Sequence, residues 1–172
     1  HILTQCVEQD LQQVMLFLLP YISTENVHKY NKHGQNALSL TCQKGWLTTM
    51  RAIIQQHPAT SLSVNEKGEN IFHLIAASPS LDIHTVIIDI LMEIGFDVTA
   101  QDKAGNNPAM TALLNNNEKL ALCLIPHIDL NQLNTQGEHI LHIAIYTQAT
   151  RAAEKILQHH AKITQKTLPT LY

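Results

Sequence analysis

Four glycines recur along this 172-residue chain at intervals of 34, 37 and 32 residues. The sequence after each glycine follows one pattern, in which a polar residue stands at the second position and an apolar segment starts at the third. These glycines are Gly34, Gly68, Gly105 and Gly137. A period of this length indicates a stack of small repeated units. Because such a unit is too small to bury a core alone, it must pack against its neighbours.

The residues around each glycine predict two short helices per unit. Glycine adopts the positive φ angle that a tight turn needs, and Asn36, Asn70 and Asn107 are good N-cap residues for the helix that follows. Pro108 then falls at a first-turn position, where its missing N–H costs nothing. We predict first helices at 37–44, 71–78, 108–115 and 140–147, and second helices at 47–56, 84–94, 118–126 and 150–159.

At these positions the chain resembles the ankyrin repeat family. The segment 95–108 resembles the end of one ankyrin repeat and the start of the next, and His73 and His142 stand where the family carries its motif histidine. The resemblance implies an all-α solenoid of helix-turn-helix units with short β-turn or hairpin connections. It implies a single domain over 1–172, with a truncated first repeat at 1–30 and full repeats at 31–64, 65–101, 102–133 and 134–166.

Composition excludes several classes of protein. The chain is 45% hydrophobic and only 15% charged, with a formal net charge of −3, which argues against disorder and against binding to nucleic acid or to a membrane surface by bulk charge. Its apolar stretches are shorter than a bilayer span needs, and it starts with no basic segment typical of a secretory signal. We therefore expect a monomeric cytoplasmic domain. Because residue 1 already falls inside a repeat, we also expect a longer protein around it.

Catalytic and metal-binding patterns are sparse. The chain has no nucleophile elbow, phosphate-binding loop or paired cysteine motif. His139 with His142, and His159 with His160, are the histidine pairs closest to a metal site, but a capping role and a helix C-terminus explain them better. Cys6, Cys42 and Cys123 fit buried apolar positions. We predict no enzyme activity, no cofactor and no metal.

The resemblance also implies where a partner would bind. In the family, residues beside the turn glycine and at the end of the first helix line a concave groove. On this sequence the expected partner-binding residues are Lys32, His33, Gln35, Gln43, Lys44, Trp46, Glu66, Lys67, Glu69, Lys103, Asn106, Asn115, Thr135, Gln136, Glu138 and Tyr146. Trp46 and Tyr146 are the candidate anchors, because interface energy concentrates on Trp, Tyr and Arg. The alternative for Trp46 is that it packs over its own repeat.

Two functions follow from this interpretation. The first is a non-enzymatic module that binds a protein partner through its groove. The second is the targeting or substrate-recruiting part of a larger enzyme whose catalytic domain lies elsewhere. The Asn-, Gln- and Ile-rich composition resembles that of proteins from AT-rich genomes. Together with the ankyrin resemblance, it implies an effector that an intracellular bacterium delivers into a host cell, which would place the partner in the host cytoplasm or nucleus.

Overall fold

The computed structural model is a one-dimensional stack of helix pairs. It describes residues 2–58, 63–79 and 82–167, with side chains up to 159, so the ends of the predicted domain at residues 1 and 172 lie outside the described residues. The first helices of the pairs are α1 (Ile2–Glu8), α4 (Ala37–Lys44), α6 (Ile71–Ala76), α8 (Pro108–Leu114) and α10 (Ile140–Tyr146). The second helices are α2 (Gln12–Leu18), α5 (Leu47–Gln56), α7 (Ile83–Glu93), α9 (Glu118–Leu124) and α11 (Thr150–Thr167).

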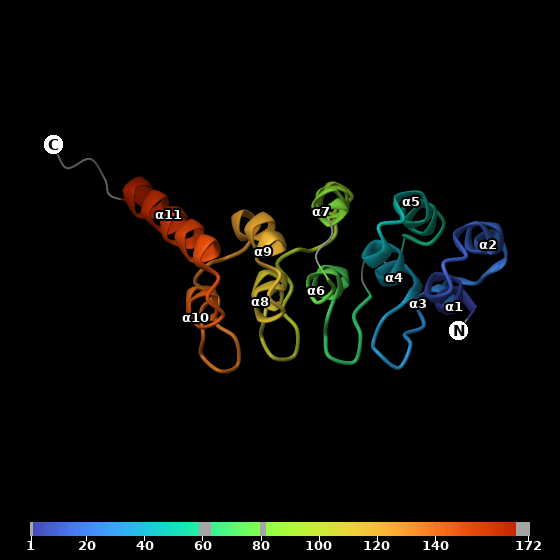
Figure 1. The fold of residues 1–172 in the computed structure, drawn as a ribbon, viewed down its shortest axis with the longest axis horizontal. Coiled ribbons are helices and arrows are strands. Elements are labelled where there is room, and N and C mark those ends of the chain that lie inside the picture. The colour runs from blue at the N-terminus through green and yellow to red at the C-terminus, as the bar shows by residue number, and fades with distance from the viewer. Residues whose placement is uncertain (1, 59–62, 80–81, 168–172) are drawn as a thin grey trace.

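The helices form two rows. Figure 1 shows the first helices in a middle row, the second helices in an upper row and the connecting turns below, with α1 and α11 at opposite ends of the stack. Among the described residues, β structure is limited to one bridge between Leu133 and His139. The predicted all-α repeat fold is therefore confirmed. None of the helices in the described ranges has the length and apolar character that a membrane span requires.

The predicted capping residues start the first helices. The side chain of Asn36 accepts from the Ser39 N–H at 2.9 Å, and the Ser39 hydroxyl accepts from the Asn36 N–H at 3.0 Å. This reciprocal pair satisfies two backbone donors that a helix end leaves free. Gly45 then ends α4 at φ 75°, in the left-handed region. Both α4 and α5 accordingly have the bounds that the sequence predicts.

Other helices differ from the prediction at their ends. Helices α6, α8 and α10 stop one or two residues early, and α9 gives way to a 3-10 turn at Ile125–His127, where Pro126 cannot continue the α-helical bonding. The sequence does not predict the 3-10 turn at Leu19–Tyr21 or the short helix α3 (Thr24–His28). Helix α11 also continues beyond the predicted end at residue 159.

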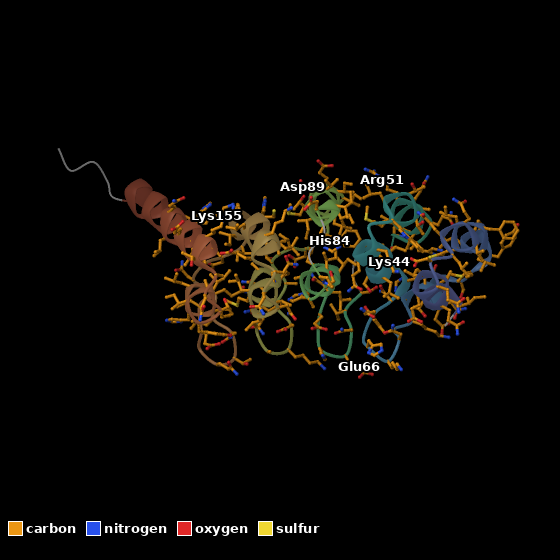
Figure 2. The ribbon with its side chains drawn as sticks, viewed as in Figure 1. Lys44, Arg51, Glu66, His84, Asp89 and Lys155 are labelled. Atoms are coloured by element: carbon orange, nitrogen blue, oxygen red, sulfur yellow. The ribbon has the colours of Figure 1, made fainter. Side chains whose placement is uncertain are left out.

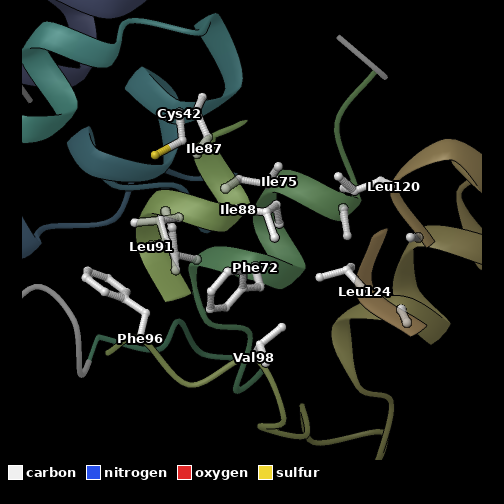
Figure 3. Close-up of a cluster of buried hydrophobic side chains, with 14 of the residues drawn as sticks. Cys42, Phe72, Ile75, Ile87, Ile88, Leu91, Phe96, Val98, Leu120 and Leu124 are labelled. Atoms are coloured by element: carbon white, nitrogen blue, oxygen red, sulfur yellow. The ribbon is translucent and has the colours of Figure 1, made fainter. Parts of the chain in front are cut away.

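The core is continuous along the stack. Phe72, Ile75 and Ile88 are fully buried, and Leu120 and Leu124 of the following pair lie in the same cluster (Figure 3). Since apolar side chains from successive pairs share one core, burial depends on the neighbouring pair as much as on the pair itself.

Candidate functional site

The four turns that precede the first helices have the same geometry. We call them the tips (residues 31–35, 65–69, 102–106 and 134–138). In the second tip the Asn65 side-chain oxygen accepts from the N–H groups of Lys67 and Glu69, at 2.9 and 3.0 Å. Asn31, Asp102 and Asn134 make the same two bonds in their own tips. An Asn or Asp three residues before each glycine thus shapes each tip.

Each tip is also bonded to the next. The Asn65 amide donates to the Gly34 carbonyl at 3.1 Å, which joins the first two tips. The Lys103 N–H donates to the Lys67 carbonyl at 2.8 Å, and the Thr135 N–H donates to the Ala104 carbonyl at 2.9 Å. The tips therefore form one connected row, visible along the lower edge of Figure 1.

His73 ties a first helix to the tip that follows it. Its ring is fully buried, Nδ1 accepts from the Asn70 N–H at 3.3 Å, and Nε2 donates to the Asn106 carbonyl at 3.0 Å. Burial lowers the pKa of the His73 imidazole, against smaller opposing effects from the Asn106 hydrogen bond and from nearby carboxylates. His142, at the equivalent position of the last described unit, is exposed.

Several expected binding residues take part in bonds within the chain. Gln43 shows this most clearly: its amide donates to the Leu74 carbonyl at 2.7 Å, and its side-chain oxygen accepts from Gln35 at 2.9 Å. Glu69 and Glu138 each accept from the asparagine of their own tip, at 2.7 and 2.9 Å. Those side chains hold the surface in shape and still present polar atoms on it. Asn106 accepts from Asn134, and the Asn115 amide donates to the Thr111 carbonyl.

A basic hollow lies between the first two tips. It has a volume of about 470 Å³, and Lys32, His33, Glu66 and Lys67 line it together with Tyr30. Glu66 lies at the lower edge of the molecule in Figure 2, away from Arg51, Asp89 and Lys155 on the upper row of second helices. The structure thus brings four of the expected binding residues together at one place. Burial raises the pKa of the Tyr30 hydroxyl, against weaker opposing bonds from Ser63 and Asn36.

A second hollow lies between the third and fourth tips. Its volume is about 330 Å³. Leu114, at the end of α8, lines it together with five of the expected binding residues, which come from two tips and the end of α10. These five are Asn106, Thr135, Gln136, Glu138 and Tyr146. Burial, and next the negative charge of Glu138, raises the pKa of the Tyr146 hydroxyl. Residues of two tips and of the ends of two first helices thus meet in this hollow.

Lys44, Trp46 and Lys103 line neither hollow. Lys44 forms an ion pair with Asp10 at 2.8 Å, and Lys103 is exposed on the third tip. Trp46 precedes α5 and packs, half-buried, against the core. Its packing over its own repeat and its role in partner binding both stay predictions.

Sequence reasoning missed the residues that build the tips. The signal was present, since Asn31, Asn65, Asp102 and Asn134 stand at a fixed distance before each glycine. Tyr30 had no such signal, because it enters the first hollow only through the path of the chain before the tip.

Metal and thiol chemistry find little support in the described part of the chain. It contains no group of three or more His, Cys, Asp or Glu side chains placed to hold a metal ion. The His139 and His142 rings lie 5.5 Å apart, and the His139 N–H donates to His142 Nδ1, as in a helix cap. The His160 side chain lies outside the described residues. Cys6 and Cys42 are buried and Cys123 is half-buried.

Comparison with known proteins agrees with this architecture. Residues 75–167 match the family model described as ankyrin repeats (3 copies). A stretch of 133 residues is 26% identical to the E3 ubiquitin-protein ligase KEG of Arabidopsis thaliana and covers 74% of this chain. The same stretch covers 8% of the plant protein, so the chain spans a small part of that relative's length.

Proposed function

Because the chain belongs to the ankyrin repeat family, we propose that it is a non-enzymatic module that binds a protein partner through its four tips and the adjoining ends of its first helices. Ankyrin repeats are protein-interaction modules, and their stacked units present one extended surface. The proposal concerns which part of that surface the partner contacts.

The observation that carries this proposal is that one set of groups in the tips holds their shape while another set of side chains faces the solvent. Asn and Asp side chains and backbone groups bond the tips internally and to one another. The exposed side chains of Lys32, Lys67 and Gln136 project from that fixed frame. A preorganised surface loses little freedom when it binds, which favours affinity. The mixture of lysine, glutamate and amide side chains suits a protein better than a phosphate backbone.

Capture from cell lysate followed by calorimetry tests the proposal. The double variant Lys32→Ala with Lys67→Ala should weaken binding of the captured protein by about 1 kcal/mol or more and leave the fold intact. The matched control is Glu154→Ala on outer helix α11, which should bind as the wild type does. Binding that is lost through Glu154→Ala and kept by the double variant would contradict the assignment of the surface.

A second candidate function is the recruitment of substrates to a larger enzyme. The similarity to an E3 ubiquitin-protein ligase over 8% of that ligase's length favours it. The complete reading frame decides: a catalytic domain in the same protein supports recruitment, and its absence supports a free-standing module. A bacterial effector with a host protein as partner, and a monomeric cytoplasmic state, rest on sequence alone and stay predictions.

A further inference from the structure

The hollow between the third and fourth tips has a distinctive chemical character. Its lining contains one charged side chain, the carboxylate of Glu138. Its two large apolar side chains are unusually open to solvent, since Leu114 is 40% exposed and Tyr146 is 53% exposed. An unopposed carboxylate between two apolar walls is suited to a ligand that is itself both apolar and positively charged.

The same tip geometry elsewhere in the stack lacks these walls. Glu69 makes the same bond to its tip asparagine as Glu138 does. Nine residues after the turn glycine, however, the first and second full units carry Gln43 and Ala77, where the third and fourth carry Leu114 and Tyr146. Gln43 is already bonded to the Leu74 carbonyl. The aromatic and aliphatic walls therefore distinguish the hollow at Glu138.

We propose that the hollow between Leu114, Glu138 and Tyr146 is a subsite for a cationic side chain, arginine above lysine, on an extended segment of the protein partner. This inference rests on the proposed function and names the chemistry of the partner at one point of the surface. The occupant is a peptide side chain, because the hollow of about 330 Å³ is open between two tips and admits one long side chain from the exposed side.

Each part of an arginine side chain finds a matching group. Its aliphatic stem packs against Leu114, and its planar guanidinium stacks on the Tyr146 ring. The guanidinium also donates to the Glu138 carboxylate, one oxygen of which already accepts from Asn134 at 2.9 Å and is thereby fixed in place. Lysine offers the charge and the stem but not the planar group, so arginine binds more tightly.

The test is a titration of the isotope-labelled protein, followed by NMR, with an acetylated and amidated Gly-Gly-Arg-Gly-Gly peptide. The probe should shift the resonances of residues 104–106, 134–138 and 146. Replacing its arginine by the neutral isostere citrulline, or the protein's Glu138 by Gln, should raise the dissociation constant about three- to five-fold, as expected for a partly exposed ion pair. Glu138→Gln keeps an oxygen that accepts from Asn134, so the tip should stay folded.

Companion variants separate the contributions of ring, charge and fold. Tyr146→Ala should weaken binding and Tyr146→Phe should retain it, because the ring face carries the interaction. Glu154→Gln removes the same charge from outer helix α11 and should leave the dissociation constant unchanged. Equal affinity for the arginine and citrulline peptides, shifts that map outside the hollow, or no shift at the highest peptide concentration would each overturn the subsite.

Failure of the subsite and failure of the proposed function give different results. If no arginine peptide binds, but the double variant Lys32→Ala with Lys67→Ala still weakens binding of a captured partner, the proposed tip surface is supported and the proposed cationic subsite is wrong. If the arginine peptide binds at Glu138 but no tip substitution changes the affinity for the captured partner, the hollow binds arginine, and both the proposed docking surface and the assignment of the subsite to that partner are wrong.

Discussion

The Nε2 atom of His73 lies 3.0 Å from the carbonyl oxygen of Asn106, which is 33 residues further along the chain. One imidazole thus caps its own helix and holds the tip of the next unit. His73→Ala should lower the free energy of unfolding by about 1–3 kcal/mol, because it removes a fully buried ring and leaves the partly buried Asn106 carbonyl without its donor. Urea denaturation measures this. The control His142→Ala removes an exposed motif histidine and should cost clearly less; equal losses would contradict the link between units.

Stability should fall as the pH drops from 7.5 to 5.5. Burial is the main cause that lowers the pKa values of His28, His73 and His84 below the ordinary 6.5. Below pH 6.5 the unfolded chain therefore binds protons that the folded chain does not, and the equilibrium shifts toward unfolding. Urea midpoints at the two pH values measure the effect, and His73→Gln should reduce the difference between them. A midpoint that rises at pH 5.5 would refute this assignment.

Gly105 and Gly137 should respond differently to alanine. Their φ angles are 75° and 76°, so the added Cβ brings the same backbone strain, about 1–2 kcal/mol, at both positions. At Gly105 the new Cβ would also lie 2.8 Å from the Thr135 nitrogen and 2.9 Å from the Asn134 Cα, whereas at Gly137 nothing lies within 4 Å. Thermal unfolding should show a cost at least about 1 kcal/mol larger for Gly105→Ala. Equal costs would mean that the third and fourth tips do not touch.

The three cysteines should react with maleimide in a defined order. Cys42 is fully buried, and burial raises the pKa of its thiol far above the usual range. Cys123 is half-buried; burial raises the pKa of its thiol as well, but the sulfur is more accessible. Because labelling needs an accessible thiolate, mass spectrometry should find Cys123 modified first and Cys42 last under native conditions. In concentrated urea all three should react alike, and early labelling of Cys42 in the folded protein would contradict its place in the core.

Removal of metal ions should leave the melting temperature unchanged. The described residues hold no cluster of three ligands, and the His139–His142 pair fits a helix cap. A calorimetric scan with and without excess chelator measures this. A drop of several degrees with chelator would instead identify His139 and His142 as ligands, because metal bound to the folded form adds to stability.

The sequence predicts the helical units well because their signals are local. Asn36 and Gly45 fix the two ends of α4 through bonds within a few residues, so pattern reading finds them. The links between units depend on groups more than 30 residues apart, such as the Asn65 amide and the Gly34 carbonyl, and no local pattern encodes that pairing. The position of Trp46 shows the same limit, since only packing decides whether an aromatic side chain beside a helix covers the core or faces a partner.

Two of the bonds that join the tips run from backbone to backbone, between Lys103 and Lys67 and between Thr135 and Ala104. Every residue except proline has the N–H group that donates, and every residue has the carbonyl that accepts. Over evolutionary time, the side chains at positions 67, 103 and 104 are therefore free to change what the surface recognises while these two backbone bonds persist. Thr135 is less free, because its hydroxyl also donates to the Ala104 carbonyl at 2.9 Å. The row of tips can therefore change its binding specificity by single substitutions while the backbone bonds between the units are kept.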